Sequence, residues 1–569
     1  MKLPEKALTR GLILLLLALI IATIILGSVP PVDRDALTHH LFVPKLWLKH
    51  GGIYEIPEIP FSYYPMNLDL LYTIPLYFSN DIIPKYIHYL FALLTALLLY
   101  RHLKKRLGMH YGLLGALFFL SVPIIVKLSI TVYVDLGVVF FTTASLLLLL
   151  HWAEQNFKWR WLVLAGLCCG LAAGTKYNGL IAIVVLTLLV PIIYQQNTRK
   201  EKQSNGKALL WGCVFGLAVL TSFLPWLIRN YAWTGNPISP LHNSLFQELR
   251  QSNDNQQGTY SANLAGTLQQ ISQQGSNAFI GRKILYNEPW WQALLLPFRF
   301  FYEGKDDDPR YFDGKLTPFL LVLPALAFLF RLPDAQQRRE QNFLLSFAVL
   351  YFFLTFFQEA MRIRYIVPIV PPLVILSIFG LRGLITTLCI RITPTTHRKT
   401  AVIIVAIVIP FTMLWYNGQY FINQFTIVQP IPYVQGKVSR DDYITAFRQE
   451  YPAIRIANTV VPKDAKVLCL FLGNRGYYMD FHPVFEQPYA SDGILTHFLT
   501  DKNQQHTIID EMRQRNINHI LLRSDLTAQW LDQLSDQDRQ RIAPLFAHSE
   551  QPLWSGQGHI LLTVAQQKQ

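Results

Sequence analysis

The chain has 569 residues, of which 51% are hydrophobic and only 15% are charged, whereas an average soluble domain carries about 25% charged residues. The 50 lysines and arginines outnumber the 36 aspartates and glutamates, which gives a net charge of +14. A basic chain is typical of nucleic-acid binders, but apolar runs such as Leu12–Leu26, Phe91–Tyr100 and Ala401–Ile409 exclude a soluble fold. The composition also excludes a disordered or disulfide-stapled protein. It predicts a polytopic membrane protein.

About eleven apolar segments are candidates for membrane-spanning helices, since a bilayer core of about 30 Å needs roughly 17–25 helical residues. The first segment follows Lys2, Lys6 and Arg10 and has no small-residue cleavage site, which favours an uncleaved helix over a signal peptide. In chain order the segments are Gly11–Leu26, Ile82–Tyr100, Tyr111–Ile125, Leu136–Trp152, Trp161–Ala173, Leu180–Ile193, Ala208–Ile228, Thr317–Phe330, Phe343–Phe357, Ile366–Leu381 and Ala401–Trp415.

The lysines and arginines between these segments indicate the orientation in the membrane. About 20 of them, against five acids, lie in every second connection, counted from an N-terminus placed inside. Short cytoplasmic connections are rich in lysine and arginine, so we expect the N-terminus in the cytoplasm and, with an odd number of helices, the C-terminus outside. The basic excess therefore reflects membrane orientation and not a nucleic-acid partner.

Three polar segments are expected on the outer side. They are a first loop, residues 29–81, a long loop, residues 229–316, and a C-terminal soluble domain, residues 417–569, which follows a membrane domain of residues 1–416. In the long loop, Trp290–Leu296 is typical of a helix lying in the membrane interface.

The C-terminal segment has the pattern of a small α/β domain. Lys466–Leu472, His519–Arg523 and His559–Val564 predict short buried strands. Thr507–Arg515 predicts a helix between two of them.

Ionisable residues gather at the outer ends of the predicted helices, and such groups cost several kcal/mol at membrane depth. They are Asp33, Asp35, His39, His40 and Asp69 in the first loop, Asp135 at a helix start, Lys176 in the turn Gly174–Gly179, Arg229 at a helix end, and Glu359, Arg362 and Arg364 between two later helices. Each also has a purely structural interpretation. The acids can be solvated loop residues or helix caps, the cations can snorkel or anchor the topology, and the histidines can be core residues.

Together these residues suit the chemistry of a lipid-linked phosphate. Lysine and arginine would hold the phosphate and stabilise its charge as it leaves, and a carboxylate would accept the proton of an attacking hydroxyl or amine. The sequence has no Walker-type glycine-rich loop, no zinc-spaced Cys/His set and no GxSxG elbow.

Short motifs at these positions carry a family resemblance. They are Val32–His40, Tyr133–Asp135, Gly174–Tyr177, Pro225–Tyr231 with Gly235–Pro237, and Arg364–Pro368. In their order and common sidedness they resemble the GT-C superfamily of polyprenyl-phosphate-sugar glycosyltransferases over about residues 11–415. The likeness is greatest to the bacterial branch of ArnT-type lipid A aminoarabinose transferases and relatives of protein O-mannosyltransferases. The first motif lacks the usual adjacent Asp-Glu, and Asp35, followed by Ala-x-x-His, fits better than Asp33.

The resemblance implies a GT-C fold and one displacement at the anomeric carbon with inversion. It implies that Asp35 is the base or the carboxylate that orients the acceptor, with Asp33 in support, and that Asp135 organises the donor site through a metal or an arginine. Lys176 and one of Arg229, Arg362 and Arg364 would contact the donor phosphate. The accessory candidates are His39, His40, Asp69 and Glu359. A divalent cation stays open as a cofactor, with Asp135 and Asp35 as its candidate ligands.

The expected partners are a polyprenyl-phosphate sugar, an envelope acceptor (lipid A, another glycan or a protein) and the lipid bilayer of a bacterial inner membrane. A lipid or sugar transporter is the main alternative, but such proteins place polar sites at the midplane and show internal repeats, and the sequence shows neither. A non-catalytic envelope assembly protein is a third possibility, in which the outer acids are dispensable.

Overall fold

The protein is described as a computed structural model that covers residues 5–198, 205–244, 246, 282–283, 285–330, 334–356, 361–391, 395–486, 493–501, 506–547 and 551–564. For residues 5, 356, 391 and 395–404 only the backbone is described. The chain divides into two compact units. One comprises Met1–Val29, Tyr64–Ile238 and Gln273–Val434, and the other comprises Pro30–Tyr63, Ser239–Ser272 and Gln435–Gln569. Each is described separately.

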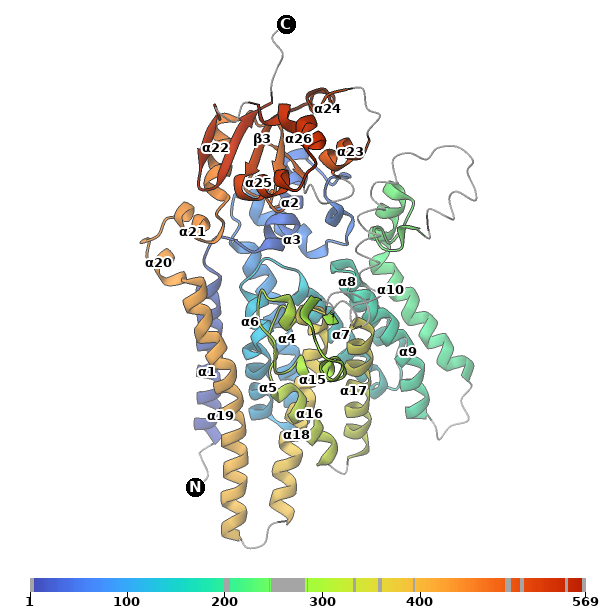
Figure 1. Cartoon of the computed structure of the whole chain (residues 1–569). Coiled ribbons are helices and arrows are strands. Elements are labelled where there is room, and N and C mark those ends of the chain that lie inside the picture. Colours follow the sequence, from blue (N-terminus) through green and yellow to red (C-terminus); the bar gives the residue numbers. More distant parts are fainter. Residues whose placement is uncertain are drawn as a thin grey trace. The chain divides into compact units, whose positions relative to one another are not determined.

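The first unit is a helical bundle (Figure 1). Its helices are α1 (Glu5–Gly27), α3 (Asn67–Tyr77), α4 (Ile83–Leu107), α5 (Met109–Ser121), α6 (Pro123–Ser129), α7 (Asp135–Glu154), α8 (Trp159–Thr175), α9 (Gly179–Thr198), α10 (Asn205–Thr234), α14 (Trp290–Leu294), α15 (Leu296–Arg299), η3 (Pro309–Tyr311), α16 (Phe319–Leu329), α17 (Ala335–Phe356), η4 (Ile363–Ile369), α18 (Val370–Arg391), α19 (Thr395–Val428) and α20 (Pro430–Val434).

All eleven predicted membrane segments coincide with helices to within two residues at their ends, and Tyr111–Ile125 contains the break between α5 and α6. Residue 357, the end of one segment, lies outside the described residues. Among the described residues, seven helices are long and apolar enough to cross a membrane, or eight if α5 and α6, bent by 67°, form one span. The expected count of eleven is higher because α8 and α16 are short apolar helices of 17 and 11 residues. The first turns of α17 are polar, with Gln336 to Glu340 among them.

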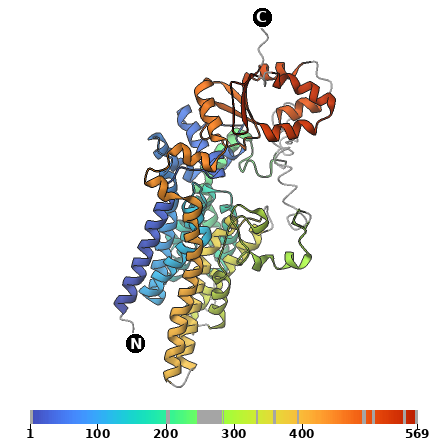
Figure 2. The same ribbon diagram turned by 60° about the vertical axis from the view of Figure 1, so that its left-hand side comes forward.

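The packing separates a buried centre from flanking helices. α18 packs against α16 and α17, and α7 packs against α4 and α8. α1 and α19 run side by side along one flank (Figures 1 and 2), and they bury the smallest shares of their apolar segments. Their remaining apolar side chains suit contact with lipid tails.

The second unit contains a five-stranded sheet in the order β2-β1-β3-β5-β4. β1 is parallel to β2 and β3, whereas β5 is antiparallel to β3 and β4. Its elements are η1 (Ala36–His40), α2 (Phe42–His50), η2 (Pro60–Tyr63), α21 (Arg440–Phe447), α22 (Tyr451–Val460), β1 (Lys466–Leu470), β2 (His482–Glu486), α23 (Ile494–Thr500), α24 (Ile508–Gln514), β3 (Ile517–Arg523), α25 (Ser524–Asp532), α26 (Asp536–Ile542), η5 (Ala543–Phe546), β4 (Trp554–Gly556) and β5 (His559–Thr563).

The predicted small α/β region at the C-terminal end is therefore confirmed, and the three predicted strands correspond to β1, β3 and β5. The predicted helix corresponds to α24. β2 and β4 were not predicted. The helix predicted to end at Trp415 continues to Val428, past the expected start of the soluble domain at 417.

Candidate functional site

The centre of the candidate site is an ion pair between Asp135 and Lys176. Lys176 Nζ lies 2.8 Å from Asp135 Oδ1, and the two side chains are 15% and 6% exposed. Asp135 is the first residue of α7, where the positive end of the helix dipole favours a carboxylate. Lys176 comes from the short turn between α8 and α9. Two residues that the sequence placed on one side of the bundle thus meet directly.

The backbone before α7 is held by two buried side chains. The phenol of Tyr72 donates a hydrogen bond to the carbonyl of Tyr133 at 2.5 Å. His88, which is fully buried, accepts from the Leu136 amide through Nε2 and lies 3.1 Å from the Thr131 carbonyl through Nδ1. A carbonyl only accepts, so the proton of the neutral ring belongs on Nδ1. These contacts hold the backbone on both sides of Asp135.

Tyr72 also connects Asp135 with Asp69. Burial, followed by the charges of Asp69 and Asp135, raises the pKa of the Tyr72 phenol well above its ordinary value. The phenol therefore remains a hydrogen-bond donor at physiological pH. Asp69 is itself buried, in the first turn of α3, and its charge acts on the same phenol as that of Asp135.

Arg364 supplies a second cation beside the pair. Its guanidinium lies 5.3 Å from the ring centre of Tyr133 and 5.4 Å from that of Tyr365. Lys176 Nζ lies 5.5 Å from the Tyr365 ring, so both cations share one aromatic neighbour. An aromatic ring attracts a cation that lies over its face, so these rings help to hold the two cationic side chains in place.

Asp135 has one oxygen to spare. Its Oδ1 is bonded to Lys176, whereas its Oδ2 is buried and has no hydrogen-bond partner among the described residues. A buried acceptor that is left unpaired costs free energy. Such a cost is typical of sites whose ligand or substrate completes the hydrogen bonding.

Arg229 lies near the Lys176 turn and is held by neighbours of its own. Its guanidinium stacks on Trp226 at 4.4 Å and donates to Asn230 Oδ1 at 2.7 Å and to the Tyr64 carbonyl at 3.1 Å. Asn230 donates in turn to the phenol of Tyr177, the residue after Lys176. Arg229 is therefore connected to the lysine turn through Asn230.

Arg362 has a different partner. Its Nε lies 3.6 Å from Asp313 Oδ2, in the segment that precedes α16. The next residue, Ile363, donates its amide to the carbonyl of Phe312. Arg362 thus anchors this segment to η4. Glu359 lies outside the described residues.

The first acidic motif lies in the other unit, at a π-helical turn. Asp33 and Asp35 are half-buried, and Asp35 directly precedes η1. His39 and His40 are buried, and the His39 ring stacks on Phe61 at 4.5 Å. π-helical turns occur often at functional sites.

This motif is attached to the C-terminal sheet by the segment that follows β1. The Tyr477 amide donates to the Leu37 carbonyl at 3.1 Å. Lys45 of α2 donates to the carbonyls of Tyr477 and Met479 at 2.9 and 2.8 Å and pairs with Asp480 at 3.1 Å. Burial lowers the pKa of Lys45, and Asp480 opposes that shift. The C-terminal domain therefore positions the turn that carries Asp35.

Three residues of the site, Asn67, Tyr72 and His88, were not singled out by the sequence, and Tyr177 and Asn230 lie in the motifs Gly174–Tyr177 and Pro225–Tyr231 without an expected role of their own. Asn67 joins two helices, because its amide donates to the Leu171 carbonyl and accepts from the Trp226 indole. The close approach needs Gly174, where a Cβ would lie 2.5 Å from the Asn67 amide nitrogen. In the sequence, Asn67 could have been identified as a polar residue among the apolar positions of a helix.

A metal site has no direct support among the described residues, where no group of three or more His, Cys, Asp or Glu residues could hold an ion. The nearest charged partner of Asp135 is the Lys176 ammonium group.

One protein-family model matches part of the chain. Residues 58–234 match the family model of dolichyl-phosphate-mannose-protein mannosyltransferase, a segment that contains Asp69, Asp135, Lys176 and Arg229. A search among curated protein sequences finds no match.

Solved structures with the same fold include ArnT from Cupriavidus metallidurans bound to undecaprenyl phosphate, with a TM-score of 0.54 and 12% identity over 98% of this chain and 99% of that chain. The archaeal oligosaccharyltransferase AglB from Archaeoglobus fulgidus, in complex with an inhibitory peptide and a dolichol-phosphate, has a TM-score of 0.50 and 14% identity over 92% and 70%. The chain thus has the GT-C fold, and the resemblance seen in its motifs is confirmed at the level of the fold.

Proposed function

We propose that this protein is an integral membrane glycosyltransferase. It moves a sugar from a polyprenyl (undecaprenyl) phosphate-linked donor to an acceptor of the cell envelope, with inversion at the anomeric carbon. The observation that carries the proposal is the shielded Asp135–Lys176 pair beside Arg364. The GT-C fold and the mannosyltransferase family match support the same reaction class.

Lys176 and Arg364 are proposed to bind the donor phosphate. Both side chains lie over the Tyr365 ring. Two cations can neutralise the charge that grows on the leaving phosphate. Asp135 holds Lys176 in place before the donor arrives and accepts a hydrogen bond on its free oxygen afterwards. Arg229 and Arg362 are alternative phosphate ligands.

The acceptor is proposed to react at the Asp35 carboxylate. Asp35 accepts the proton of the acceptor hydroxyl or amine as the new bond to the anomeric carbon forms. The bond from that carbon to the phosphate oxygen breaks, and its electron pair stays on the phosphate oxygen. The products are the glycosylated acceptor and polyprenyl phosphate. Asp33 supports Asp35.

The proposed location is the bacterial inner membrane, which the chain crosses several times. The N-terminus is placed in the cytoplasm and the C-terminal α/β domain in the periplasm. The support is the alternation of basic segments along the chain, because lysine and arginine are retained on the cytoplasmic side.

The decisive assay incubates the purified full chain with an undecaprenyl-phosphate sugar and measures the release of undecaprenyl phosphate with and without lipid A, glycan or peptide acceptors. We expect release that depends on an acceptor. Asp35→Asn should reduce turnover by at least about 10³-fold, and Asp33→Asn, the matched control, should reduce it less. Near-normal turnover of purified Asp35→Asn would contradict the assignment, and donor translocation without release would favour a transporter.

A further inference from the structure

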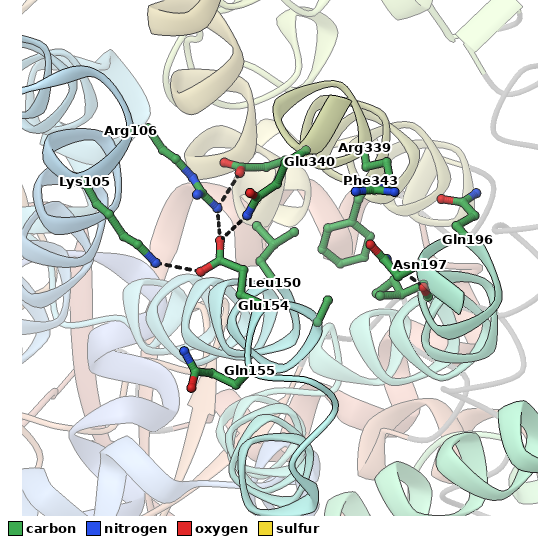
Figure 3. Close-up of a pocket in the computed structure, with 13 residues that line it drawn as sticks. Lys105, Arg106, Leu150, Glu154, Gln155, Gln196, Asn197, Arg339, Glu340 and Phe343 are labelled. Carbon is green, nitrogen blue, oxygen red and sulfur yellow. Dashed lines mark hydrogen bonds and ion pairs between the residues drawn. The ribbon is translucent and has the colours of Figure 1, made fainter. Parts of the chain in front are cut away.

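A polar pocket (Figure 3) lies at the end of α7 opposite to the Asp135–Lys176 pair. It has a volume of about 480 Å³ and lies where α4 and α7 end, α9 approaches its end and α17 begins. α7 has 20 residues, so a rise of 1.5 Å per residue separates its two ends by about 28 Å. The pocket is therefore independent of the site described above.

Two carboxylates in this pocket are paired with cations of the same chain. Glu340, whose side chain is 2% exposed, lies 2.5 Å from His102 Nε2 and 2.8 Å from Arg106 Nη2. Glu154 lies 2.6 Å from Lys105 Nζ and also pairs with Arg106 (Figure 3). Shielded carboxylates need such partners. Neither acid is free to hold an additional cation.

Arg339 is a third pocket cation, and it has no ion pair among the described residues. Lys105, Arg106 and Arg339 against Glu154 and Glu340 give the pocket a formal charge of +1. In Figure 3 Arg339 lies beside Phe343, on the side of the pocket that faces Asn197 of α9. An exposed guanidinium and a nearby amide are the donors that a phosphate oxygen requires.

The rest of the lining suits an amphiphile. Leu150, Ile193 and Phe343 give the pocket an apolar part, and Phe343 and Ile193 are buried. A free inorganic anion would gain nothing from these side chains, whereas the glycerol and first acyl carbons of a lipid would.

Aromatic residues at the same end indicate a membrane interface. Trp152 packs edge-on against Phe157 and Trp211, and Tyr194 packs edge-on against Phe157. Trp159, at the start of α8, is 65% exposed. Exposed tryptophans are enriched at the level of lipid headgroups, so Trp159 supports a headgroup depth for this end of the bundle.

We propose that this pocket binds the phosphodiester of an anionic glycerophospholipid, with Arg339 as its principal ligand. The single negative charge of the phosphodiester matches the formal charge of the pocket. The bound lipid connects the end of α9 to the start of α17, two helices that pack against each other.

The test compares Arg339→Gln with Arg338→Gln in the purified full chain. Arg338 is a matched control because it is the preceding residue of the same helix and does not line the pocket. Native mass spectrometry during titration with phosphatidylglycerol and with phosphatidylcholine measures the number of bound lipids and their affinity. We expect one preferred phosphatidylglycerol site, about tenfold weaker in Arg339→Gln and unchanged in Arg338→Gln.

Three outcomes would overturn the proposal: equal binding of the two lipids, an equal effect of the two substitutions, or displacement of the lipid by millimolar inorganic phosphate or glycerol-3-phosphate. The last outcome would assign the pocket to a free phosphate compound. Size-exclusion chromatography checks that both variants are folded. We expect them to be folded, because Arg339 is exposed.

Discussion

α7 carries an acid at each end, Asp135 in its first turn and Glu154 in its last. Glu154 is paired with Lys105 and Arg106 and accepts a hydrogen bond from Gln336. Asp135 is paired with Lys176 alone and keeps a buried oxygen without a hydrogen-bond partner in the described chain. The two acids therefore differ in how completely their carboxylate oxygens are paired with other groups of the chain. The Glu154 carboxylate joins helices and is not itself a ligand-binding group, whereas the Asp135 carboxylate can still accept a hydrogen bond from a ligand.

The largest expected effect is on turnover when the ion pair is altered. Lys176→Gln should lower turnover by about 10²–10³-fold and, by leaving Asp135 buried without its partner, destabilise the chain by about 3–5 kcal/mol. The double variant Lys176→Gln/Asp135→Asn should regain most of the stability but none of the activity. Thermal unfolding and donor turnover of both variants check this. Recovery of activity together with stability would mean that the pair is only structural.

At the Glu154 end of α7, loss of an ion pair should reduce stability and leave turnover nearly unchanged. Glu340→Gln leaves Arg106 and His102 facing a neutral amide, so we expect a loss of stability of about 3 kcal/mol and turnover per folded molecule within about twofold. Glu303→Gln is the control, because its pair with Arg299 is 42% exposed on the glutamate side and exposed pairs contribute about 0–1 kcal/mol. A turnover loss as large as that of Lys176→Gln would end the distinction between the two ends.

Arg364→Lys tests whether the contacts of Arg364 with the Tyr133 and Tyr365 rings contribute to donor binding in addition to its charge. The substitution keeps the positive charge and loses the planar group over Tyr133 and Tyr365, so the donor KM should rise about tenfold. Arg382→Lys is the matched control, since Arg382 lies 5.7 Å from the Tyr111 ring away from the site. Equal kinetic effects of the two substitutions would show that the ring contacts are not specific to the donor.

The smallest effect is expected for Tyr72→Phe, which removes a hydrogen bond to the Tyr133 carbonyl and should cost about 1 kcal/mol. Because the pKa of Tyr72 is raised in the folded chain, its contribution to stability is present below the unfolded pKa of about 10 and is lost as the pH rises further. The wild type should therefore lose stability above pH 10 more steeply than Tyr72→Phe in a pH series of thermal unfolding. Parallel curves would contradict this.

The sequence predicted most of the helices and singled out Asp135 and Lys176 as candidates, because apolar length and charges at helix ends are local signals. Asp135 lies between Val134 and Leu136, and Lys176 lies in a short turn between two apolar helices, so both charges are visible in the chain. Their contact was not derivable, because it depends on how α7 packs against α8.

Other features of the site arise only from tertiary packing and have no local signal in the sequence. Nothing local to His88 or Tyr72 shows that they hold the backbone before α7, since both lie in apolar helices. Arg362 and Arg364 are two residues apart and look alike in the sequence, yet η4 directs one to Asp313 and the other to the tyrosine rings. The docking of Tyr477 on Leu37 joins residues 440 positions apart, which no motif indicates.

The central claim is that the donor phosphate binds at the Lys176 end of the bundle. A cryo-electron microscopy structure of the full chain with undecaprenyl phosphate tests it most directly. The account predicts the phosphate at about 3 Å from Lys176 Nζ and from the Arg364 guanidinium, with Asp135 still beside the lysine. A phosphate bound elsewhere, with the Asp135–Lys176 pair closed and unchanged, would contradict it.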